Sequence, residues 1–184
     1  MNMPAAWARS ALAVGTSSMC GDLVCQRLHA ADNDDFTWDA RRTASFGLVG
    51  FVALGPASHG FELLLEKLAP GSGALSVAKK VGARVVSAPV FLSISFGGLA
   101  LLGGRDVMQA LSTGVLPAWY IGSFFWPPVS IVLYRYVSLT ARPAAASLVG
   151  AGWATYISFV ANDGERHVAV DAAAPPECDA KVLR

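Results

Sequence analysis

A long stretch without any ionisable side chain constrains this chain more than any other feature. From Val107 to Tyr134 the sequence reads VMQALSTGVLPAWYIGSFFWPPVSIVLY and holds no Asp, Glu, Lys, Arg or His. A hydrocarbon core of ~30 Å takes about 20 apolar helical residues, so this stretch is long enough to cross a membrane. Pro117 predicts a division into a short entry piece and a full span. Pro127-Pro128 predicts a kink, which helices in membrane bundles tolerate when neighbouring groups satisfy the freed carbonyls.

The composition of the whole chain favours the same class. Of its 184 residues, 54% are hydrophobic and 15% are charged, and the mean hydropathy is +0.47. An ordinary globular domain carries about 25% charged residues. The net charge of +1 gives no basic footprint for nucleic acid. Cys20, Cys25 and Cys178 are an odd set without metal-site spacing, so they indicate neither a disulfide framework nor a metal centre.

Three further intervals lack Asp, Glu, Lys and Arg and predict membrane helices. They are residues 43–61, which can extend to Leu68, residues 85–104 and residues 143–162. Glycines such as Gly47 and Gly50 let helices approach closely in lipid. The predicted fold is therefore all-α, a proline-kinked transmembrane bundle of four or five spans in a single domain, residues 1–162. Residues 163–184 are polar and are predicted to form a disordered tail.

The first 28 residues allow three interpretations. We favour a first membrane helix over residues 4–28 that holds Asp22 inside the bundle, because an ionisable group within a span usually faces the interior or a cavity. Arg9 followed by small residues also fits a secretory signal peptide. A mitochondrial presequence is the third interpretation, although it should contain more arginine.

Polar residues between these intervals predict loops and flanks. Residues 29–42 contain a cluster of aspartates and predict a solvated loop. The sequence APGSG predicts a turn, and Lys79, Lys80 and Arg84 follow it as a basic patch. This patch either binds anionic lipid headgroups or serves as an ordinary anchor at the flank of a span.

Several short motifs resemble, in order and spacing, those of one family of small membrane proteins. They are Gly15, Gly21-Asp22-x-x-x-Gln26, Arg42, Gly55-Pro56-x-x-His59, Lys79, Ala88-Pro89, Trp119, Trp126-Pro127, Tyr134, Val137, Arg142 and Trp153-x-x-Tyr156-x-Ser158. Together they run from about Gly15 to Phe159 and resemble the Mpv-seventeen / peroxisomal membrane protein twenty-two family.

The chain departs from the family pattern at several polar positions. Ala83-Arg84 stands where members typically carry Asp-Gln. Ser130, Leu133, Ser138 and Ala154 stand in place of Gln, Asn, Pro and Asn. These departures affect any channel selectivity or gating that is carried over from relatives, and they leave the predicted fold intact.

The resemblance implies an integral protein of an organelle membrane, the mitochondrial inner membrane in preference to the peroxisomal membrane. It also implies a weakly selective channel for small solutes that contributes to membrane permeability and metabolite homeostasis. The implied partners are the lipid bilayer, small solutes or ions, and further copies of the chain in a homo-oligomer.

Polar side chains in or beside the apolar intervals are candidates for lining or gating a pore, because their hydration is costly to remove. These candidates are Asp22, Gln26, His59, Glu62, Arg84, Arg135 and Arg142. His59 and Glu62 lie three residues apart on one helical face, which predicts an interfacial pair or, alternatively, a proton relay or gate. If the charged candidates pair with one another instead, they hold a closed bundle, and the protein is a non-conducting structural or scaffold protein.

The remaining motif residues are predicted to have structural roles. They are Gly21, Gly55, Pro56, Pro89, Trp119, Trp126, Pro127, Trp153 and Tyr156. The sequence has no Ser/His/Asp constellation, metal-ligand spacing or glycine-rich phosphate loop. We therefore expect no enzymatic activity, no cofactor and no metal.

Overall fold

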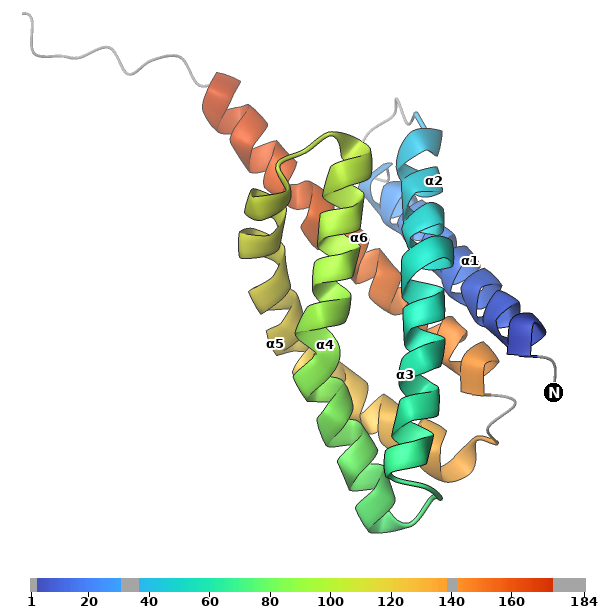
Figure 1. The fold of residues 1–184 in the computed structure, drawn as a ribbon. Helices are drawn as coiled ribbons and strands as arrows, with labels where there is room; N and C mark the ends of the chain where they lie inside the picture. Colours follow the sequence, from blue (N-terminus) through green and yellow to red (C-terminus); the bar gives the residue numbers. More distant parts are fainter. Residues whose placement is uncertain (1–2, 31–36, 139–141, 174–184) are drawn as a thin grey trace, which may run out of the picture.

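Helices make up the regular structure of the part of the chain that the computed structural model describes, residues 3–30, 37–138 and 142–173. In chain order the segments are α1 (Met3–Ala30), α2 (Ala40–Leu48), the π-helix η1 (Val49–Leu54), α3 (Gly55–Leu68), α4 (Ala74–Gly103), α5 (Val107–Tyr136) and α6 (Arg142–Ala173). Because α2, η1 and α3 follow one another without a break, they form one continuous rod. The rods run alternately up and down (Figure 1).

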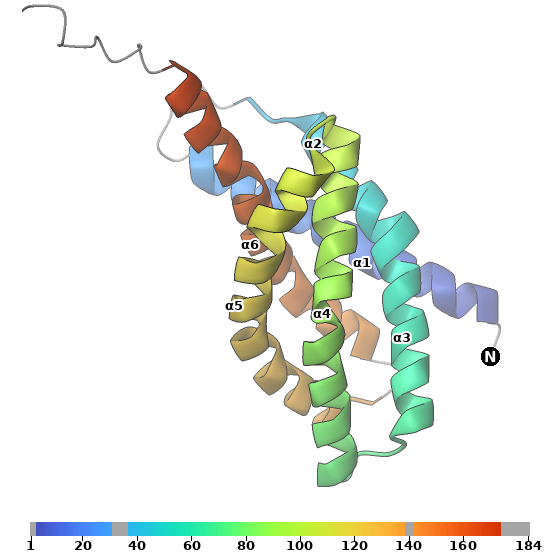
Figure 2. The same cartoon turned by 60° about the vertical axis from the view of Figure 1, so that its left-hand side comes forward.

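In the bundle, α4 stands between the α2–α3 rod and α5, and α1 and α6 cross behind them (Figures 1 and 2). The helix α1 packs along α6 and also contacts α2, η1 and α3, while α4 packs along α5. We name the end where α2 begins and α4 ends the upper end, and the end where α3 ends and α4 begins the lower end.

Three of the described rods are long and apolar enough to cross a membrane. They are Ala40–Leu68, Ala74–Gly103 and Val107–Tyr136. Their outward faces carry large apolar side chains, such as Val86, Leu101 and Phe124, which are 78%, 72% and 68% exposed. In water such faces would be extended apolar patches, whereas in a bilayer they meet lipid. The predicted class, an all-helical multi-pass membrane protein, is confirmed, and whether α1 and α6 add further spans stays a prediction.

Two predicted boundaries differ from the structure. The third predicted span begins not at residue 85 but at Ala74, because Lys80 and Arg84 have acidic partners on α3 and need no solvated flank. The helix α6 continues through residues 163–173, which are predicted to belong to the disordered tail. Residues 174–184 of the predicted tail and residues 31–36 of the predicted loop lie outside the described residues.

The predicted division at Pro117 is wrong, because α5 is a single helix from Val107 to Tyr136. One proline removes one backbone donor, and the buried neighbours Gly114 and Ala118 keep this part of the helix packed. The adjacent Pro127-Pro128 removes two donors in succession. Figures 1 and 2 show α5 curving in its lower half, as the predicted kink requires.

The π-helix η1 ends at Leu54, two residues before Pro56. A proline lacks the N–H that would bond the carbonyl four residues earlier, and its ring crowds that carbonyl. The chain widens by one residue at this point, so that the N–H of Gly55 donates to the carbonyl of Gly50, five residues back. The rod therefore continues without a break through the π-helical segment and into α3, which contains Pro56.

Pro89 in the interior of α4 has a partner on the neighbouring helix. Its missing N–H leaves the carbonyl of Val85 without the usual helical donor. The indole Nε1 of Trp119 on α5 donates to that carbonyl at 2.9 Å. Membrane bundles tolerate interior prolines when a neighbouring helix satisfies the freed group, so this hydrogen bond explains Pro89 and Trp119 together and ties α4 to α5.

Glycines let the helices approach one another at two motif positions. A Cβ at position 21 would lie 2.5 Å from the Cβ of Ala154 and 2.6 Å from the carbonyl oxygen of Ala151, so α1 contacts α6 backbone to backbone. A Cβ at position 55 would lie 2.5 Å from the Cα of Ala11. Close packing of this kind drives helix association in lipid, and the structural role predicted for Gly21 and Gly55 follows from it.

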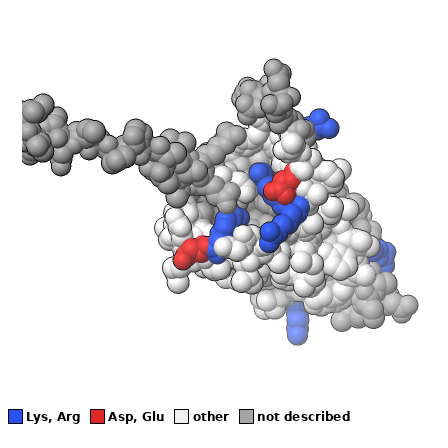
Figure 3. Space-filling model, turned by 90° about the horizontal axis from the view of Figure 1, so that it is seen from above, with Lys and Arg blue, Asp and Glu red and all other residues white. Residues whose placement is uncertain are grey.

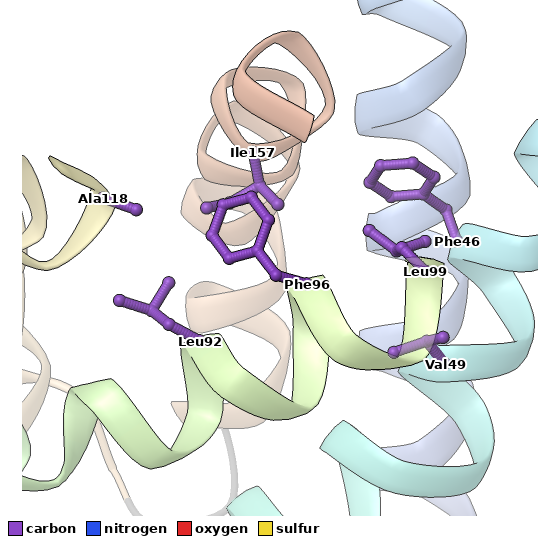
Figure 4. Packing of buried hydrophobic residues seen from close by; sticks show 7 residues of the cluster. All are labelled: Phe46, Val49, Leu92, Phe96, Leu99, Ala118 and Ile157. Carbon is purple, nitrogen blue, oxygen red and sulfur yellow. The ribbon is translucent and has the colours of Figure 1, made fainter. Parts of the chain in front are cut away.

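An apolar cluster joins the rods in the bundle interior. Its buried members are Phe46, Val49, Leu92, Phe96, Leu99, Ala118 and Ile157. Figure 4 shows these side chains reaching toward one another from the α2–η1 rod, α4, α5 and α6. A second, smaller cluster of Leu65, Val77 and Tyr134 lies at the lower end.

Candidate functional site

A fully buried carboxylate organises the polar contacts near the upper end. The Oδ1 atom of Asp22 accepts hydrogen bonds from Arg42 Nε at 2.7 Å and Ser158 Oγ at 2.6 Å. Its Oδ2 atom accepts from Gln26 Nε2 and Thr43 Oγ1, each at 2.7 Å. We name these five residues the Asp22 network. Because one buried charge meets four donors, one of them cationic, the carboxylate is both neutralised and fully hydrogen-bonded.

Local helix geometry brings these residues together. Asp22 and Gln26 lie four residues apart on α1 and so share a face. Asp39 caps α2 by accepting from the backbone N–H of Arg42 at 2.9 Å, which sets Arg42 in the first turn. Gln26 bonds both backbone groups of Asp39, since its Nε2 donates to the carbonyl at 3.1 Å and its Oε1 accepts from the N–H at 2.9 Å. Gln26 therefore fixes the start of α2 against α1.

A second group of charges gathers at the lower end. Its members are Glu62 and Glu66 of α3, Lys80 and Arg84 of α4, Tyr134 of α5 and Arg142 of α6, which we name the Tyr134 network. In one half, Glu62 pairs with Arg84 Nη2 and accepts from the Tyr134 hydroxyl at 2.9 Å. Arg84 Nε donates to the same hydroxyl at 2.7 Å. The tyrosine therefore bridges the cation and the carboxylate.

The other half of the Tyr134 network centres on Glu66. Lys80 Nζ is fully buried and donates to Glu66 Oε2 at 2.6 Å and to the carbonyl of Gly71 at 3.1 Å. Arg142 Nη1 reaches the same Oε2 atom at 3.4 Å. One carboxylate oxygen thus serves two cations.

Three cations surround a single ring in this network. The side-chain charges of Lys80, Arg84 and Arg142 lie 5.3, 5.7 and 5.2 Å from the centroid of the Tyr134 ring. Each distance is within the ~6 Å range of a cation–π contact. The network holds three cations against two carboxylates, so it carries one positive charge in excess.

Arg142 also caps the end of α5. Its Nε donates to the carbonyls of Leu133 and Val137 at 3.2 and 3.1 Å, and its Nη2 donates to the carbonyl of Tyr134 at 3.4 Å. The last carbonyls of a helix have no partner within the helix, and a cation there also complements the helix dipole. Arg142 therefore links the end of α5, the start of α6 and Glu66 of α3.

The two networks are separated by about the thickness of a bilayer core. At ~1.5 Å per residue, the rod from Arg42 to Glu62 measures roughly 30 Å. Between the networks along α4 lie the buried apolar side chains Leu92, Phe96 and Leu99. The molecule thus places its charges at the two ends of an apolar interior.

The structure divides the predicted pore candidates among different places. Asp22 and Gln26 belong to the Asp22 network, whereas Glu62, Arg84 and Arg142 belong to the Tyr134 network. Arg135 is exposed, and its Nη1 reaches the carbonyl of Ser72 at 3.5 Å. Each network thus includes predicted candidates, and each also draws on residues outside the predicted set.

His59 lies apart from both networks. Its Nδ1 is 3.2 Å from Ser10 Oγ, and its ring contacts that of Trp7 with centroids 5.1 Å apart. The predicted pairing of His59 with Glu62 is therefore wrong, because α3 turns His59 toward α1 and Glu62 toward α4 and α5.

The predicted basic patch is likewise not a single surface. Lys80 and Arg84 point inward to the carboxylates of α3, and Lys79 alone of the three is exposed. The lipid-headgroup role predicted for the patch as a unit is therefore wrong, because two of its cations are already paired.

Sequence reasoning missed Glu66 as a partner of Lys80, although a signal was present. Glu66 and Lys80 stand at equal distances in sequence from Gly73, as do Glu62 and Arg84. Two helices that fold back at the APGSG turn bring such positions face to face, so an antiparallel hairpin pairs each acid with a base.

The motif aromatics pack together where α5 meets α6. Trp153 contacts Trp126 edge to face with ring centroids 5.8 Å apart, stacks on Phe125 at 5.5 Å and contacts Tyr156 at 5.0 Å. Pro127 follows directly in the curved half of α5. These contacts agree with the structural role predicted for Trp126, Trp153 and Tyr156.

Comparison with known proteins identifies the family. A model described as the Mpv17 / PMP22 family matches residues 100–158. Protein sym-1 of Neurospora crassa is 31% identical over 146 residues, which cover 76% of this chain and 83% of that protein. The chain belongs to the Mpv17/PMP22 family. The family model matches residues of each network. These include Tyr134 and Arg142 of the Tyr134 network and Ser158 of the Asp22 network.

Other relatives of this Mpv17/PMP22 member come from two organelles by name. The mitochondrial inner membrane protein Mpv17 of Danio rerio is 29% identical over 85% of this chain and 90% of its own length. Peroxisomal membrane protein 2 of Bos taurus is 27% identical over 78% of this chain and 77% of its own length. No solved structure matches the chain. The chain is thus a multi-pass helical protein of a family of organelle membrane proteins.

Proposed function

We propose that this protein lets small solutes pass the mitochondrial inner membrane with weak selectivity, and that the arrangement described above is its closed state. The observation that carries the proposal is the Tyr134 network, in which three cations and two carboxylates from α3, α4 and α6 meet around one tyrosine ring of α5.

The physical argument begins with the cost of burying these charges. Well-packed apolar side chains of similar volume often stabilise a protein as well as a buried ion pair does, or better. Ionisable groups on membrane helices are therefore functional candidates by default. The Tyr134 network also carries a positive excess and is partly open to solvent, since the side chains of Glu62 and Glu66 are 29% and 33% exposed.

The apolar interior supplies the second part of the proposal. Leu92, Phe96 and Leu99 separate the two networks along α4. Apolar constrictions close channels by excluding water, so this interior would act as the barrier. Separation of the pairs that join α3 to α4 and α6 would let water enter from the lower end, and the freed cations would then favour anions over cations.

The proposed location follows from relatives and not from the residues themselves. Mpv17 of Danio rerio is named as a mitochondrial inner membrane protein, and this chain covers 90% of it. The bilayer and small solutes or ions are then the partners of the protein.

A second candidate function is that of a non-conducting structural protein of the same membrane. The Asp22 network favours it, because all four hydrogen bonds to the buried carboxylate come from within the chain. A lock of this kind holds α1, α2 and α6 together without any need for conduction.

Planar-bilayer recordings of the purified protein and of Glu66→Gln distinguish the two functions. Glu66→Gln removes the charge that Lys80 and Arg142 share, so a gate should open for a larger fraction of the time. Lys79→Gln is the matched control, because Lys79 is the exposed neighbour of Lys80 on α4. Absence of current from both the parent and Glu66→Gln, with both proteins folded, would reject the channel in favour of the structural protein.

A further inference from the structure

Ser130 of α5 is an exception among the buried polar residues. Its side chain is 1% exposed, and in the described part of the chain its Oγ is the only buried side-chain nitrogen or oxygen without a hydrogen-bond partner. Ser158, which is equally buried, donates to Asp22 and accepts from Arg42. A buried hydroxyl costs free energy unless it is hydrogen-bonded, so an unpartnered one in a membrane bundle needs a reason.

The position of Ser130 on α5 suggests that reason. Ser130 and Tyr134 stand four residues apart and therefore share a face of the helix. Because α5 runs from the upper to the lower end (Figure 1), Ser130 lies about 6 Å deeper in the bundle than Tyr134. We propose that Ser130 lines the water-filled pathway of the open state, one helical turn behind the Tyr134 network. This inference rests on the proposed channel and specifies the course of its pathway.

A hydroxyl at this position favours the open state. In the closed state the Ser130 hydroxyl has no protein partner. In the open state it meets water or a solute, to which a hydroxyl can both donate and accept a hydrogen bond. The bond is made only after opening, so it stabilises the open state relative to the closed one.

The buried positions of α5 above Ser130 are small, and rings from other helices cover them. They are Gly114, Ala118 and Gly122. A Cβ at position 114 would lie 2.8 Å from the ring of Phe96 on α4, and one at position 122 would lie 3.1 Å from the ring of Trp153 on α6. In the closed state these rings occupy the space beside the small residues, so they form the barrier that follows Ser130.

Of the two ends, the lower one leads to an unpartnered buried group. Figure 3 looks onto the upper end and shows acidic and basic side chains beside one another there. The buried polar residues of the Asp22 network near that end, such as Gln26 and Thr43, are hydrogen-bonded within the chain. The position of Ser130 therefore assigns the entry of water to the lower end.

Substitution by cysteine tests whether water reaches position 130. The three native cysteines are first replaced by serine. The variant Ser130→Cys is then treated in a planar bilayer with a negatively charged methanethiosulfonate, because the freed cations should admit an anion. The thiolate is the reactive form of a cysteine, and it attacks the reagent to form a mixed disulfide and release methanesulfinate. A closed protein populates its open state to about 0.1–10%. Reaction should therefore be about tenfold faster when Glu66→Gln is added to open the gate, and the current should fall as it proceeds.

Ile131→Cys is the matched control. Ile131 is the next residue of α5 and has an exposed side chain on the outer face of the bundle. A cysteine there meets lipid, in which a thiolate does not form, so it should stay unmodified with and without Glu66→Gln. The inference is overturned if Glu66→Gln carries current while Ser130→Cys stays unmodified, or if Ile131→Cys reacts as fast as Ser130→Cys. Absence of current from every variant would instead reject the channel itself, and this inference with it.

Alanine variants provide a second test that needs no added cysteine. Ser130→Ala removes no hydrogen bond of the closed state, so its free energy of unfolding in detergent should equal or exceed that of the parent. Its open fraction in the bilayer should fall about tenfold, because the hydrogen bond that the open state alone makes is lost. Ser158→Ala is the matched variant, since it loses the bonds to Asp22 and Arg42 and should be less stable than the parent. A loss of stability in Ser130→Ala as large as that in Ser158→Ala, or an unchanged open fraction, would contradict the inference.

Discussion

The two charged networks use the same side-chain chemistry in opposite ways. The Asp22 network gives one carboxylate four donors and is closed to solvent around that carboxylate. In the Tyr134 network, Lys80 and Arg142 both contact the same oxygen of Glu66, and a third of the Glu66 side chain is exposed. In the Asp22 network the carboxylate has all its hydrogen bonds and one cation matches its charge. In the Tyr134 network two cations share one carboxylate oxygen, and positive charge is in excess.

This difference indicates which network can change state. Breaking the Asp22 network would leave a buried carboxylate and several donors without partners. We therefore expect this network to break only when the protein unfolds. The Tyr134 network can exchange partners, because water reaches its carboxylates and Arg142 can replace Lys80 at Glu66. We therefore assign the first to stability and the second to regulation of the proposed pathway.

The largest expected effect is that of Asp22→Ala. Removing the carboxylate leaves the guanidinium of Arg42 without its ion-pair partner and deprives three further donors of their acceptor. Loss of one partner of a buried pair costs about 3–5 kcal/mol. Denaturant unfolding in detergent measures the change. Asp106→Asn is the control, because Asp106 is an exposed cap of α5 and asparagine caps about as well. A loss below about 1 kcal/mol for Asp22→Ala would show that the two networks do not differ as described.

Lys80→Met should cost less than Asp22→Ala, although Lys80 is equally buried. Glu66 keeps Arg142 as a partner and keeps its access to water, so the loss should be about 1–3 kcal/mol. The same unfolding measurement applies, with Lys79→Met as the exposed control. A loss for Lys80→Met as large as that for Asp22→Ala would make the Tyr134 network a second structural lock.

Trp119→Phe tests the uncharged link between α4 and α5, which belongs to neither network. The variant removes the indole donor to the carbonyl of Val85, at an expected cost of about 1 kcal/mol. Pro89→Ala restores a backbone donor to that same carbonyl. Unfolding of both single variants and the double variant should therefore show a smaller cost of Trp119→Phe in the alanine background. An equal cost in both backgrounds would mean that Trp119 acts only by packing.

The smallest effect is expected for Tyr134→Phe. This change removes the hydroxyl that bridges Arg84 and Glu62 and keeps the ring that the three cations surround. Arg84 and Glu62 still pair directly, so the free energy of unfolding should fall by only about 0.5 kcal/mol. Tyr134→Leu, which removes the ring as well, should lose more. Equal losses for the two variants would show that the ring contributes nothing to holding the cations.

The positions of the long apolar helices could be predicted from the sequence because a bilayer excludes charge. The stretch from Val107 to Tyr134 is predicted to span a membrane for that reason, and it lies within α5, although the predicted division at Pro117 is absent. The start of α4 could not be predicted in the same way, since Lys80 and Arg84 look like a solvated flank until Glu62 and Glu66 are placed opposite them. The residues around Lys80 and Arg84 do not reveal their acidic partners by themselves. The partners can be predicted only if α3 and α4 are first assumed to form an antiparallel hairpin.

The candidate site was predicted in part for the same reason. Asp22, Glu62 and Arg142 stand out as isolated charges in apolar surroundings, and each belongs to a network. Thr43 and Glu66 do not stand out, because a hydroxyl or a carboxylate near a helix end is ordinary. The link from Trp119 to Val85 depends on the register between two helices, which the sequence does not specify.

The reversal potential in a planar bilayer under a potassium chloride gradient tests the central claim most directly. If the excess charge of the Tyr134 network faces the pathway, the parent should prefer chloride to potassium, as charged rings set ion preference in channels. That preference should fall in Lys80→Gln and stay at the parental value in Lys79→Gln. The same reversal potential in all three proteins, or no current from any of them, would contradict the account.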